Sequence, residues 1–414
     1  MNRKYNIAVI GSGSAGMASA LLLKRAGHDV VLFEKVEKPG PVGAGVLIQP
    51  TGMFVLEKLG VLNSFLETGE KVNRLYGENQ KGKKVLNLVY NDFEEGSYGL
   101  GIHRGAIFNI LLKEVQSENI PYITGCWINS LKRKDGSAEL FKDGESQGVF
   151  DAVILCDGKN STLRKQMNVG QKVHNYKWGA LWTIVEDKQS LFHGELRQVY
   201  RTTKNIAGLL PIGKHPVTDK QSVSLFWSLR ESRVNSWREN SLEAWKKEVT
   251  ALYPDIDPLM QEIKDKDQLL FSSYSHITMK RWHDENLVCL GDAAHAMSPQ
   301  LGLGVSLGLY DAWSLVQCID QKDDLQSAFK EYSRRRRSHI RWMQFCSKLV
   351  TPMFQSSGSN WAPYRDFTFN QIHNFGFTYR LMLGTLSGVQ RGLLRKAEKH
   401  LMDFLKRMPV CSKS

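Results

Sequence analysis

A short apolar run, a glycine-rich turn, a helix-forming segment and a second apolar run open the chain, and this order restricts the fold more than any other feature. Residues 5–10 read as a buried parallel strand, because the run is too short and too continuous for an amphipathic helix. Residues 11–16 follow as GSGSAG, residues 17–26 are good helix formers ended by Gly27, and residues 29–33 form the second run. This order predicts a strand–helix–strand unit and a parallel sheet.

Each glycine of the turn has a physical role in binding a dinucleotide. Gly11 permits the sharp turn, Gly13 lets a pyrophosphate approach the backbone, and Gly16 lets helix and strand pack closely. The helix N-terminus offers free N–H groups and a positive dipole end to the phosphates. Glu34, 18 residues after the last glycine, is placed to accept both hydroxyls of an adenosine ribose. The unit predicts a dinucleotide site but does not distinguish FAD from NAD; the alternative is a glycine-rich turn in an unrelated α/β protein.

Two later strands each end in an aspartate next to a glycine. Residues 150–156 read as a strand that runs into Asp157-Gly158, and residues 286–290 as a strand that runs into Gly291-Asp292. Ligands of open α/β sheets bind at the carboxyl ends of strands. A Gly-Leu-Gly turn follows at 302–304 and predicts a helix that continues to about residue 319.

At this point the chain resembles the FAD-dependent monooxygenases of the aromatic-hydroxylase type (group A, p-hydroxybenzoate hydroxylase-like), which share a GxGxxG, a DG and a GD motif in this order. The GAGV run at 43–46 with Gln49-Pro50, a helix opened by His103-Arg104 and residues 349–356 extend the resemblance over most of the chain. The resemblance implies an α/β fold: a Rossmann-like FAD-binding domain with an inserted antiparallel-sheet substrate domain and a helical C-terminal segment.

The same resemblance implies roles for individual residues toward FAD. Asp292 would hydrogen-bond the ribityl chain, Arg104 would lie near the ribityl–pyrophosphate region, and Asp157 would hold the FAD geometry and lie on the nicotinamide approach. The helix N-terminus after Gly302 would stabilise the negative charge of reduced flavin, with the approach of this loop fixed by Pro299. The residues expected to bind the cofactor are Gly11, Gly13, Ser14, Ala15, Gly16, Glu34, Lys35, Gly45, Arg104, Asp157, Gly158, Gly291, Asp292, Pro299, Gly302, Leu303, Gly304 and Val305.

The stretch between the DG and GD motifs has a different character. Short runs at 178–185, 195–201, 206–210 and 222–229 read as strands of an antiparallel sheet, and residues 241–252 as a helix with Ser241 as its N-cap. The resemblance implies a sheet that roofs the flavin, with the substrate between sheet and ring. Four aromatic residues are candidates for an apolar pocket, the alternative being that they pack a core: Trp178, Trp182, Phe226 and Trp227.

The catalytic residues remain unassigned, because no general base stands out. His295 lies close to Asp292 and either takes part in catalysis or supports the loop. Ser306 stands where the family usually has Asn, so a polar contact to the flavin is expected to be lost or replaced by the hydroxyl. The six cysteines are scattered without a CxxC pair and indicate neither a metal site nor a disulfide framework.

The resemblance implies an enzyme in which NADPH or NADH reduces FAD, O₂ adds at C4a, and the flavin hydroperoxide hydroxylates a small aromatic or other electron-rich substrate. No second GxGxxG is present in the sequence, so the reductant is expected to bind transiently. A reductase, dehydrogenase or halogenase on the same scaffold is the first alternative, although the Trp-x-Trp-x-Ile-Pro signature of halogenases is absent from the sequence. A non-catalytic flavoprotein that binds a partner or membrane through a basic tail is the second.

The motifs divide the chain into alternating segments. We expect the FAD-binding domain in 1–72, 101–172 and 279–330, substrate-domain strands in 73–100, the substrate domain in 173–278, and a helical C-terminal region in 331–414. No apolar run is long enough for a transmembrane helix, and the first strand leaves no room for a signal peptide, so a cytoplasmic location is expected.

The net charge of +13 is concentrated in residues 331–414, which hold fifteen Lys and Arg against four Asp and Glu. No nucleic-acid module is recognisable, so no nucleic-acid partner is expected. Near the end, an apolar stripe with surrounding basic residues predicts an amphipathic helix; the stripe is Leu394, Ala397, Leu401, Leu405 and Met408, and the basic residues are Arg395, Lys396, Lys399, Lys406 and Arg407. This helix either makes weak contact with an anionic membrane surface or packs on the domain as a cap.

Overall fold

The computed structural model describes residues 3–41, 43–134, 136–358, 361–372, 375–395 and 397–409. The strand–helix–strand unit forms as predicted, with β1 (Asn6–Ile10), α1 (Ser14–Arg25) and β2 (Asp29–Phe33). β1 pairs in parallel with β2 and with β11 (Ala152–Leu155), and β11 pairs in parallel with β18 (Leu287–Cys289). The carboxyl ends of β1, β11 and β18 therefore lie side by side, and each leads into one of the three glycine-containing motifs.

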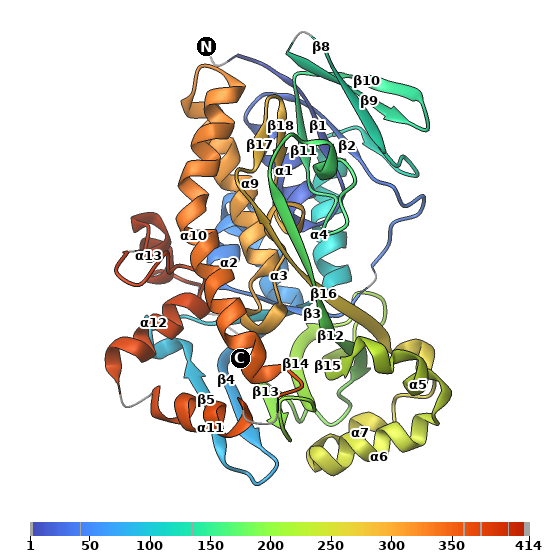
Figure 1. The fold of residues 1–414 in the computed structure, drawn as a ribbon, viewed down its shortest axis with the longest axis vertical. Coiled ribbons are helices and arrows are strands. Elements are labelled where there is room, and N and C mark those ends of the chain that lie inside the picture. Colours follow the sequence, from blue (N-terminus) through green and yellow to red (C-terminus); the bar gives the residue numbers. More distant parts are fainter. Residues whose placement is uncertain are drawn as a thin grey trace.

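A six-stranded sheet is completed around these strands. Its order is β17 (His283–Asp284), β18, β11, β1, β2 and β7 (Tyr122–Ile123). Side chains of β1 and β11 are buried along nearly their whole length, as the continuous apolar runs require of a strand covered on both faces. Figure 1 shows this sheet in the upper half of the molecule, with α1, α4, α9 and α10 running alongside.

The larger sheet carries the region between the DG and GD motifs. Its nine strands are β16 (Leu270–Met279), β12 (Gln171–Glu186), β15 (Gln221–Arg230), β14 (Ile206–Lys214), β13 (Gly194–Tyr200), β4 (Glu70–Asn79), β6 (Gly99–His103) and β3 (Gly45–Ile48), with β5 (Lys84–Val89) paired to β4. The four predicted strand runs all form, and β12, β15, β14 and β13 pair antiparallel in that order. β13 and β4 pair in parallel, so the sheet as a whole is mixed.

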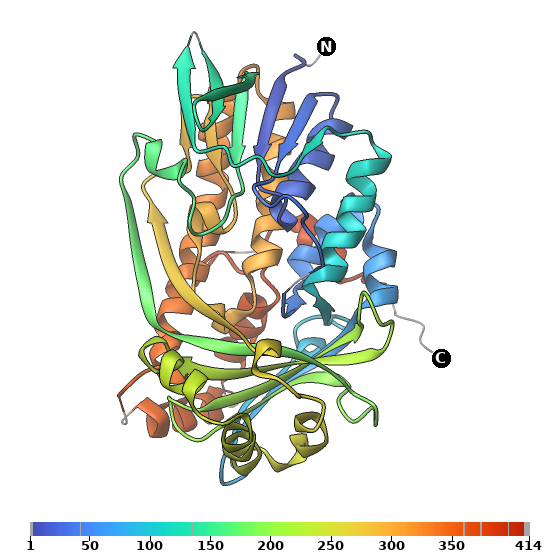
Figure 2. The same ribbon diagram turned by 90° about the vertical axis from the view of Figure 1, so that its right-hand side faces the viewer.

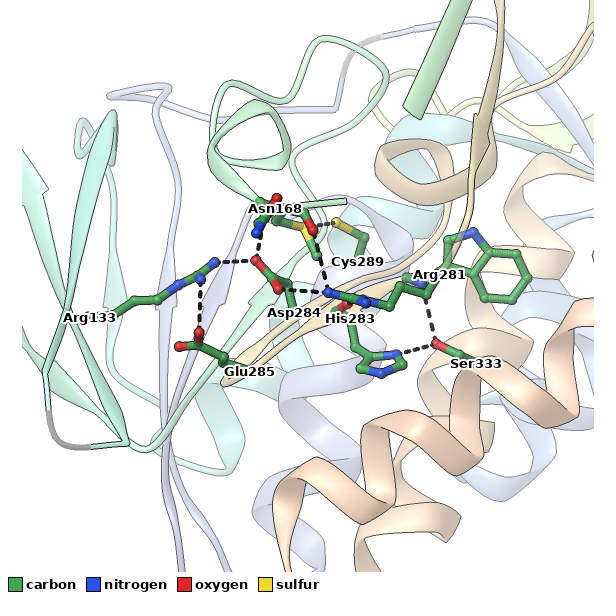
Figure 3. A network of polar contacts seen from close by, with 10 residues as sticks. Arg133, Asn168, Arg281, His283, Asp284, Glu285, Cys289 and Ser333 are labelled. Carbon is green, nitrogen blue, oxygen red and sulfur yellow. Dashed lines mark hydrogen bonds and ion pairs between the residues drawn. The ribbon is translucent and has the colours of Figure 1, made fainter. Parts of the chain in front are cut away.

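A small antiparallel sheet lies beside the edge of the six-stranded sheet. It consists of β8 (Ser130–Lys134), β9 (Ser137–Lys142) and β10 (Glu145–Phe150). Asp284 of β17 ties the two together, because its carboxylate accepts hydrogen bonds from Arg133 Nη2 at 2.5 Å, Arg281 Nη2 at 3.2 Å and the Asn168 amide at 2.7 Å (Figure 3).

The helices divide into three groups by position. Those around the six-stranded sheet are α1, α2 (Pro50–Lys58), α3 (Leu62–Thr68), α4 (Arg104–Ser117), α8 (Asp292–His295), α9 (Gly304–Gln321) and α10 (Leu325–Phe354). Those on the larger sheet are α5 (Val234–Glu239), α6 (Leu242–Leu252) and α7 (Asp257–Met260), and the C-terminal ones are α11 (Trp361–Ile372), α12 (Gly376–Leu386) and α13 (Lys399–Leu405). Ser241 caps α6 as predicted, accepting from the Ala244 amide at 3.0 Å.

The larger sheet has a hydrophobic core on each face. One extensive core joins the six-stranded sheet, its helices and one face of the larger sheet. A second core lies between the other face and the helices that follow β15, and contains Leu181, Leu225, Trp227, Trp245 and Val249. Figure 2 shows α6 and α7 below the larger sheet, on the side away from the six-stranded sheet.

The predicted C-terminal amphipathic helix is shorter than expected. α13 spans Lys399–Leu405, and Leu394, which was placed on its apolar stripe, precedes it and is 86% exposed. Leu401, Leu405 and Met408 are buried, and Phe404 packs edge-on against Phe54 of α2. Lys396 lies outside the described residues. Among the described residues, no helix combines the length and the apolar character that crossing a membrane requires.

Candidate functional site

The N-terminus of α1 lies open at the carboxyl end of β1. Gly11 has φ +101°, and a Cβ there would lie 2.7 Å from the Cys156 carbonyl oxygen. A Cβ on Gly16 would lie 1.8 Å from the Gly11 carbonyl oxygen, so the turn and α1 pack as closely as the sequence predicts. At Gly13, by contrast, no described atom beyond its chain neighbours lies within 4 Å of the Cβ position. The amides of the first turn of α1 therefore face space that an anion can enter.

Glu34 lies beside this turn, at the end of β2. Its Oε2 accepts hydrogen bonds from the Ser12 amide at 2.9 Å and the Ser12 hydroxyl at 2.8 Å, and Oε1 accepts from the Val36 amide at 2.9 Å. The Tyr122 hydroxyl donates to Ser12 Oγ at 3.0 Å. The carboxylate is thus held in place at the position predicted for a ribose acceptor, next to the exposed side chain of Lys35.

The DG motif follows β11, as predicted. Burial raises the pKa of the Asp157 carboxyl, and its Oδ1 has no hydrogen-bond partner in the described part of the chain. Gly158 has φ +80°, which favours glycine. Arg164, 1% exposed, donates to the carbonyl oxygens of Ala293 at 2.9 Å and Lys159 at 3.0 Å, and so ties the DG loop to the GD loop. Sequence reasoning assigned no role to Arg164, although it stands only six residues after Gly158.

The GD motif is held by a buried charge network. Asp311 of α9 accepts from the Gly291 amide at 3.0 Å, from Arg336 Nε at 2.7 Å, and lies 2.5 Å from His295 Nε2. Burial raises the pKa of Asp311, but His295 and Arg336 outweigh it and hold the pKa well below its usual range. His295 thus supports the loop, which is one of the two roles considered for it. Asp311 and Arg336 were missed, because they lie 20 and 45 residues beyond Gly291 and nothing in their local pattern marks them.

Beyond the GD motif, the Gly-Leu-Gly turn leads to the N-terminus of α9. Gly302 has φ +61°, Pro299 begins a short 3₁₀ turn, and no side chain caps the first turn of α9. Asp292 is exposed, and its Oδ1 lies 3.9 Å from the Cβ position of Gly304. A second uncapped helix N-terminus therefore stands close to the aspartate of the third motif.

Ser306 and Gln49 meet behind this turn. Ser306 is fully buried, and its hydroxyl accepts from the Gln49 amide at 2.9 Å, so it supports β3 and α2. The Gln49 side chain accepts from the Tyr90 hydroxyl at 2.6 Å, whereas its Nε2 is buried with no partner among residues that the structure describes. That Nε2 lies 3.7 Å from the Cβ position of Gly302. Gln49 belongs to the residues that carry the family resemblance, but the sequence predicted no role for it in the site.

Gly45 and Arg104 occupy different surroundings. A Cβ on Gly45 would lie 2.5 Å from Ser224 Cβ, and the Gly45 amide donates to Ser224 Oγ at 3.1 Å, so close packing of β3 explains this glycine. Arg104 begins α4, is exposed, and passes 3.3 Å from the Cβ position of Gly43.

The larger sheet divides the four candidate aromatic residues. The rings of Trp182 and Phe226 have centroids 5.1 Å apart and planes tilted by 38°, and Phe226 packs against the core shared with the six-stranded sheet. Trp227 packs in the second core, and Trp178 and Trp227 both line a groove beside α5 and α6. Gln355 joins β12 to the 3₁₀ turn that precedes the Gly-Leu-Gly turn: it accepts from Gln300 Nε2 at 2.8 Å and donates to the Gly179 carbonyl oxygen at 3.1 Å.

Comparison with known proteins gives the family. Residues 4–343 match the model of the FAD binding domain family. 6-Hydroxynicotinate 3-monooxygenase of Pseudomonas fluorescens is 25% identical over 82% of this chain and 89% of its own length. 6-Methylpretetramide 4-monooxygenase of Streptomyces rimosus is 25% identical over 74% of this chain and 73% of its own.

A solved structure shows the same fold. Klebsiella pneumoniae HpxO complexed with FAD and uric acid matches with a TM-score of 0.78 at 17% identity, covering 92% of this chain and 97% of that one. The predicted α/β fold and the resemblance to aromatic hydroxylases are both confirmed. This chain belongs to the FAD binding domain family and is an FAD-dependent oxidoreductase of the aromatic-monooxygenase type.

Proposed function

We propose that this enzyme uses NADPH or NADH and O₂ to hydroxylate a small aromatic or other electron-rich substrate. The observation that carries the proposal is the pair of uncapped helix N-termini, those of α1 and α9, beside the carboxyl ends of β1, β11 and β18. One suits the pyrophosphate of FAD, and the other suits the negative charge of a reduced flavin.

The chain offers a matching set of groups for the rest of FAD. In our proposal Glu34 receives the adenosine ribose, Asp292 the ribityl chain, and Arg104 the region of the pyrophosphate. The remaining residues of the proposed set are Gly11, Gly13, Ser14, Ala15, Gly16, Lys35, Asp157, Gly158, Gly291, Pro299, Gly302, Leu303, Gly304 and Val305. Gly45 stays in the set only through its backbone, since Ser224 and Ile212 occupy its side-chain position.

Two buried polar atoms support the fit. Asp157 Oδ1 and Gln49 Nε2 lack hydrogen-bond partners within the described ranges, and one lies in the DG loop while the other lies beside Gly302. A buried polar group without a partner is costly, so a ligand that supplied an acceptor to Gln49 would stabilise the site. A flavin pyrimidine ring carries carbonyl acceptors along the edge that would face this loop.

When bound, FAD supplies the redox and oxygen-transfer chemistry, and the protein supplies position, a dry chamber and electrostatics. In our proposal the substrate lies against Trp182 and Phe226, because this pair belongs to the face of the larger sheet that shares a core with the six-stranded sheet. Segments 1–72, 101–172 and 279–330 would then hold FAD, 73–100 and 173–278 would cover the substrate, and 331–414 would support both.

The test uses the purified flavin-loaded enzyme. NADPH and NADH oxidation is measured against a panel of phenols, aromatic acids, quinone precursors and indoles, and products formed under ¹⁸O₂ are analysed by mass spectrometry. We expect at least one substrate to accelerate NAD(P)H oxidation and to gain one labelled oxygen atom. Product that forms equally well without O₂ would instead identify a reductase or dehydrogenase. A chlorinated or brominated product without the oxygen label would identify a halogenase.

A further inference from the structure

A groove with a volume of about 580 Å³ lies away from the three motifs, where the middle of β12 and the end of β15 meet α5 and α6. Its lining includes four tryptophans and three cationic side chains: Trp178, Lys204, Trp227, Arg230, Arg233, Trp237 and Trp245. The volume is typical of a pocket for a small molecule, which usually measures roughly 300–1,000 Å³. The FAD site proposed above uses none of these residues.

The tryptophans give the groove rigid aromatic walls. Trp227, Trp237 and Trp245 are 3%, 9% and 4% exposed, so most of each ring is fixed in the second core. Trp237 and Trp245 meet edge to face, with centroids 6.5 Å apart and planes at 83°. Only a small part of these three rings faces the groove, and Trp178, which is partly exposed, adds to this fixed apolar wall.

The charges along the groove are mostly positive. Lys204 and Arg233 are exposed and Arg230 is partly exposed, and none of the three forms an ion pair with another described side chain. The lining carboxylate is Glu248, and its Oε1 already accepts from Asn205 Nδ2 at 3.4 Å. Two guanidinium groups and an ammonium group outnumber this carboxylate, and guanidinium binds carboxylate in a two-pronged geometry.

The indole nitrogens add a second, independent indication. Trp237 Nε1 and Trp245 Nε1 are both buried and have no hydrogen-bond acceptor in the part of the chain that the structure describes. An indole N–H is a donor only, so both rings lack an acceptor and not a donor. Protein atoms enclose each nitrogen, so a ring must turn slightly before an acceptor in the groove reaches it.

We propose that this groove is a binding site for a small planar aromatic carboxylate, distinct from the flavin site. The ring lies against the tryptophans, the carboxylate pairs with Arg230 and Arg233, and an indole N–H turns to meet it. Trp178 lines the groove, while the carbonyl oxygen of the adjacent Gly179 accepts from Gln355. The two sites thus share β12, so their occupancy must be measured separately.

The test is calorimetric titration of the flavin-loaded enzyme with 2-naphthoate, using uncharged 2-naphthalenemethanol as the matched probe. We expect 2-naphthoate to bind with a Kd below about 1 mM and the alcohol at least about tenfold more weakly, because a charge-assisted pair is lost. Arg233→Gln and Arg230→Gln should each raise the Kd for 2-naphthoate by about tenfold. Arg238 is an exposed residue of α5 outside the groove lining, so Arg238→Gln should leave the Kd for 2-naphthoate unchanged.

A further variant tests the contribution of an indole N–H to binding. The visible spectrum of the flavin shows whether 2-naphthoate also occupies the flavin site. Trp245→Phe keeps an aromatic ring but removes the N–H, and should weaken the binding of 2-naphthoate severalfold; because the smaller ring leaves space in the second core, it should also lower the Tm. The visible spectrum of the flavin should not shift as 2-naphthoate saturates the groove. Absence of binding, equal Kd values for wild type and both groove arginine variants, or a flavin shift that tracks saturation would overturn the proposal.

Discussion

Gly13 and Gly16 belong to one motif, but the described fold requires glycine only at position 16. The Cβ position of Gly16 overlaps the Gly11 carbonyl oxygen, so a side chain there would displace α1 from β1. Gly13 has φ −69°, which any residue adopts, and space around its Cβ position. Glycine at 16 therefore serves the fold, whereas open space at 13 agrees with our proposal that a pyrophosphate approaches the backbone there.

Gly13→Ala should therefore separate folding from FAD binding. We expect the Tm of the apoprotein to stay within about 1 °C of wild type, because the methyl group meets no described atom. The Kd for FAD should rise by about tenfold or more, since the methyl occupies space that the pyrophosphate needs. Titration of apoprotein with FAD, followed by flavin fluorescence, measures this change.

Gly40→Ala is the matched control, because Gly40 also has open space at its Cβ position and no positive φ. It should change neither the Tm nor the Kd. Equal Kd values for Gly13→Ala and Gly40→Ala would mean that no phosphate approaches this turn.

Gln49 Nε2 is a donor without an acceptor among the residues that the structure describes. Gln49→Leu would also remove the acceptor of the buried Tyr90 hydroxyl, so the informative comparison is Gln49→Leu/Tyr90→Phe against Tyr90→Phe alone. We expect the double variant to bind FAD about tenfold more weakly than Tyr90→Phe, and its flavin absorption bands to shift, because one hydrogen bond to the ring is lost. Identical affinity and spectra in the two variants would show that Nε2 does not reach the flavin.

At the scale of elements, patterns along the chain predicted segments better than contacts between them. β2 matches its predicted limits, and α6 begins at its predicted cap, because periodicity and capping are local properties. Alternation along β15 places Phe226 and Trp227 on opposite faces of the sheet. It does not tell which of the two faces packs toward the six-stranded sheet, so the sequence could not predict which residue lies on that side. It also missed the network of Asp311 and Arg336, whose members meet only after α9 and α10 have packed.

β17 and the small sheet depend on a similar long-range contact, centred on Asp284 (Figure 3). Its side chain is 5% exposed. Burial alone would raise its pKa, but the Asn168 amide and Arg133 outweigh burial and lower the pKa below its ordinary value. Asp284→Asn should destabilise the protein by about 3 kcal/mol at pH 7, because Arg133 and Arg281 lose their buried partner.

The pH dependence follows from the direction of that shift. A lowered folded-state pKa stabilises the protein above the unfolded pKa, about 3.9, and this contribution is lost as the pH falls through the folded value. The Tm difference between wild type and Asp284→Asn should thus be several degrees at pH 7 and shrink below about pH 4. Scanning fluorimetry at both pH values measures it, and a difference independent of pH would contradict this account.

For the whole molecule, α10 is the element that joins the two sheets. Arg336 near its middle pairs with Asp311 behind the GD motif, and Gln344 Nε2 donates to the Ile277 carbonyl oxygen of β16 at 2.6 Å. Gln355, just after its end, contacts both the 3₁₀ turn that precedes the Gly-Leu-Gly turn and β12. Within the basic C-terminal region, Arg336 is therefore a buried structural residue, 2% exposed, whereas Arg334 and Arg337 of the same run are exposed.

The basic tail was expected either to contact an anionic membrane surface or to pack on the domain as a cap, and α13 is the helix in which these two expectations can be tested. Leu405 is fully buried, so the apolar side of α13 is packed against the protein. Leu405→Ala should lower the stability by about 3 kcal/mol, as expected for a truncated core leucine, and reduce the Tm accordingly. This result would identify α13 as a cap on α2.

Charge reversal on the exposed side tests membrane contact directly. Lys399→Glu/Lys406→Glu is compared with Lys81→Glu/Lys83→Glu, an equal charge change on exposed lysines by the β4–β5 turn. If α13 is only a cap, both variants should lose sedimentation with phosphatidylserine vesicles to the same small extent, because only the net charge of +13 attracts them. A selective loss in the α13 variant would show that this helix contacts the anionic surface through its lysines while its leucines remain packed on the domain.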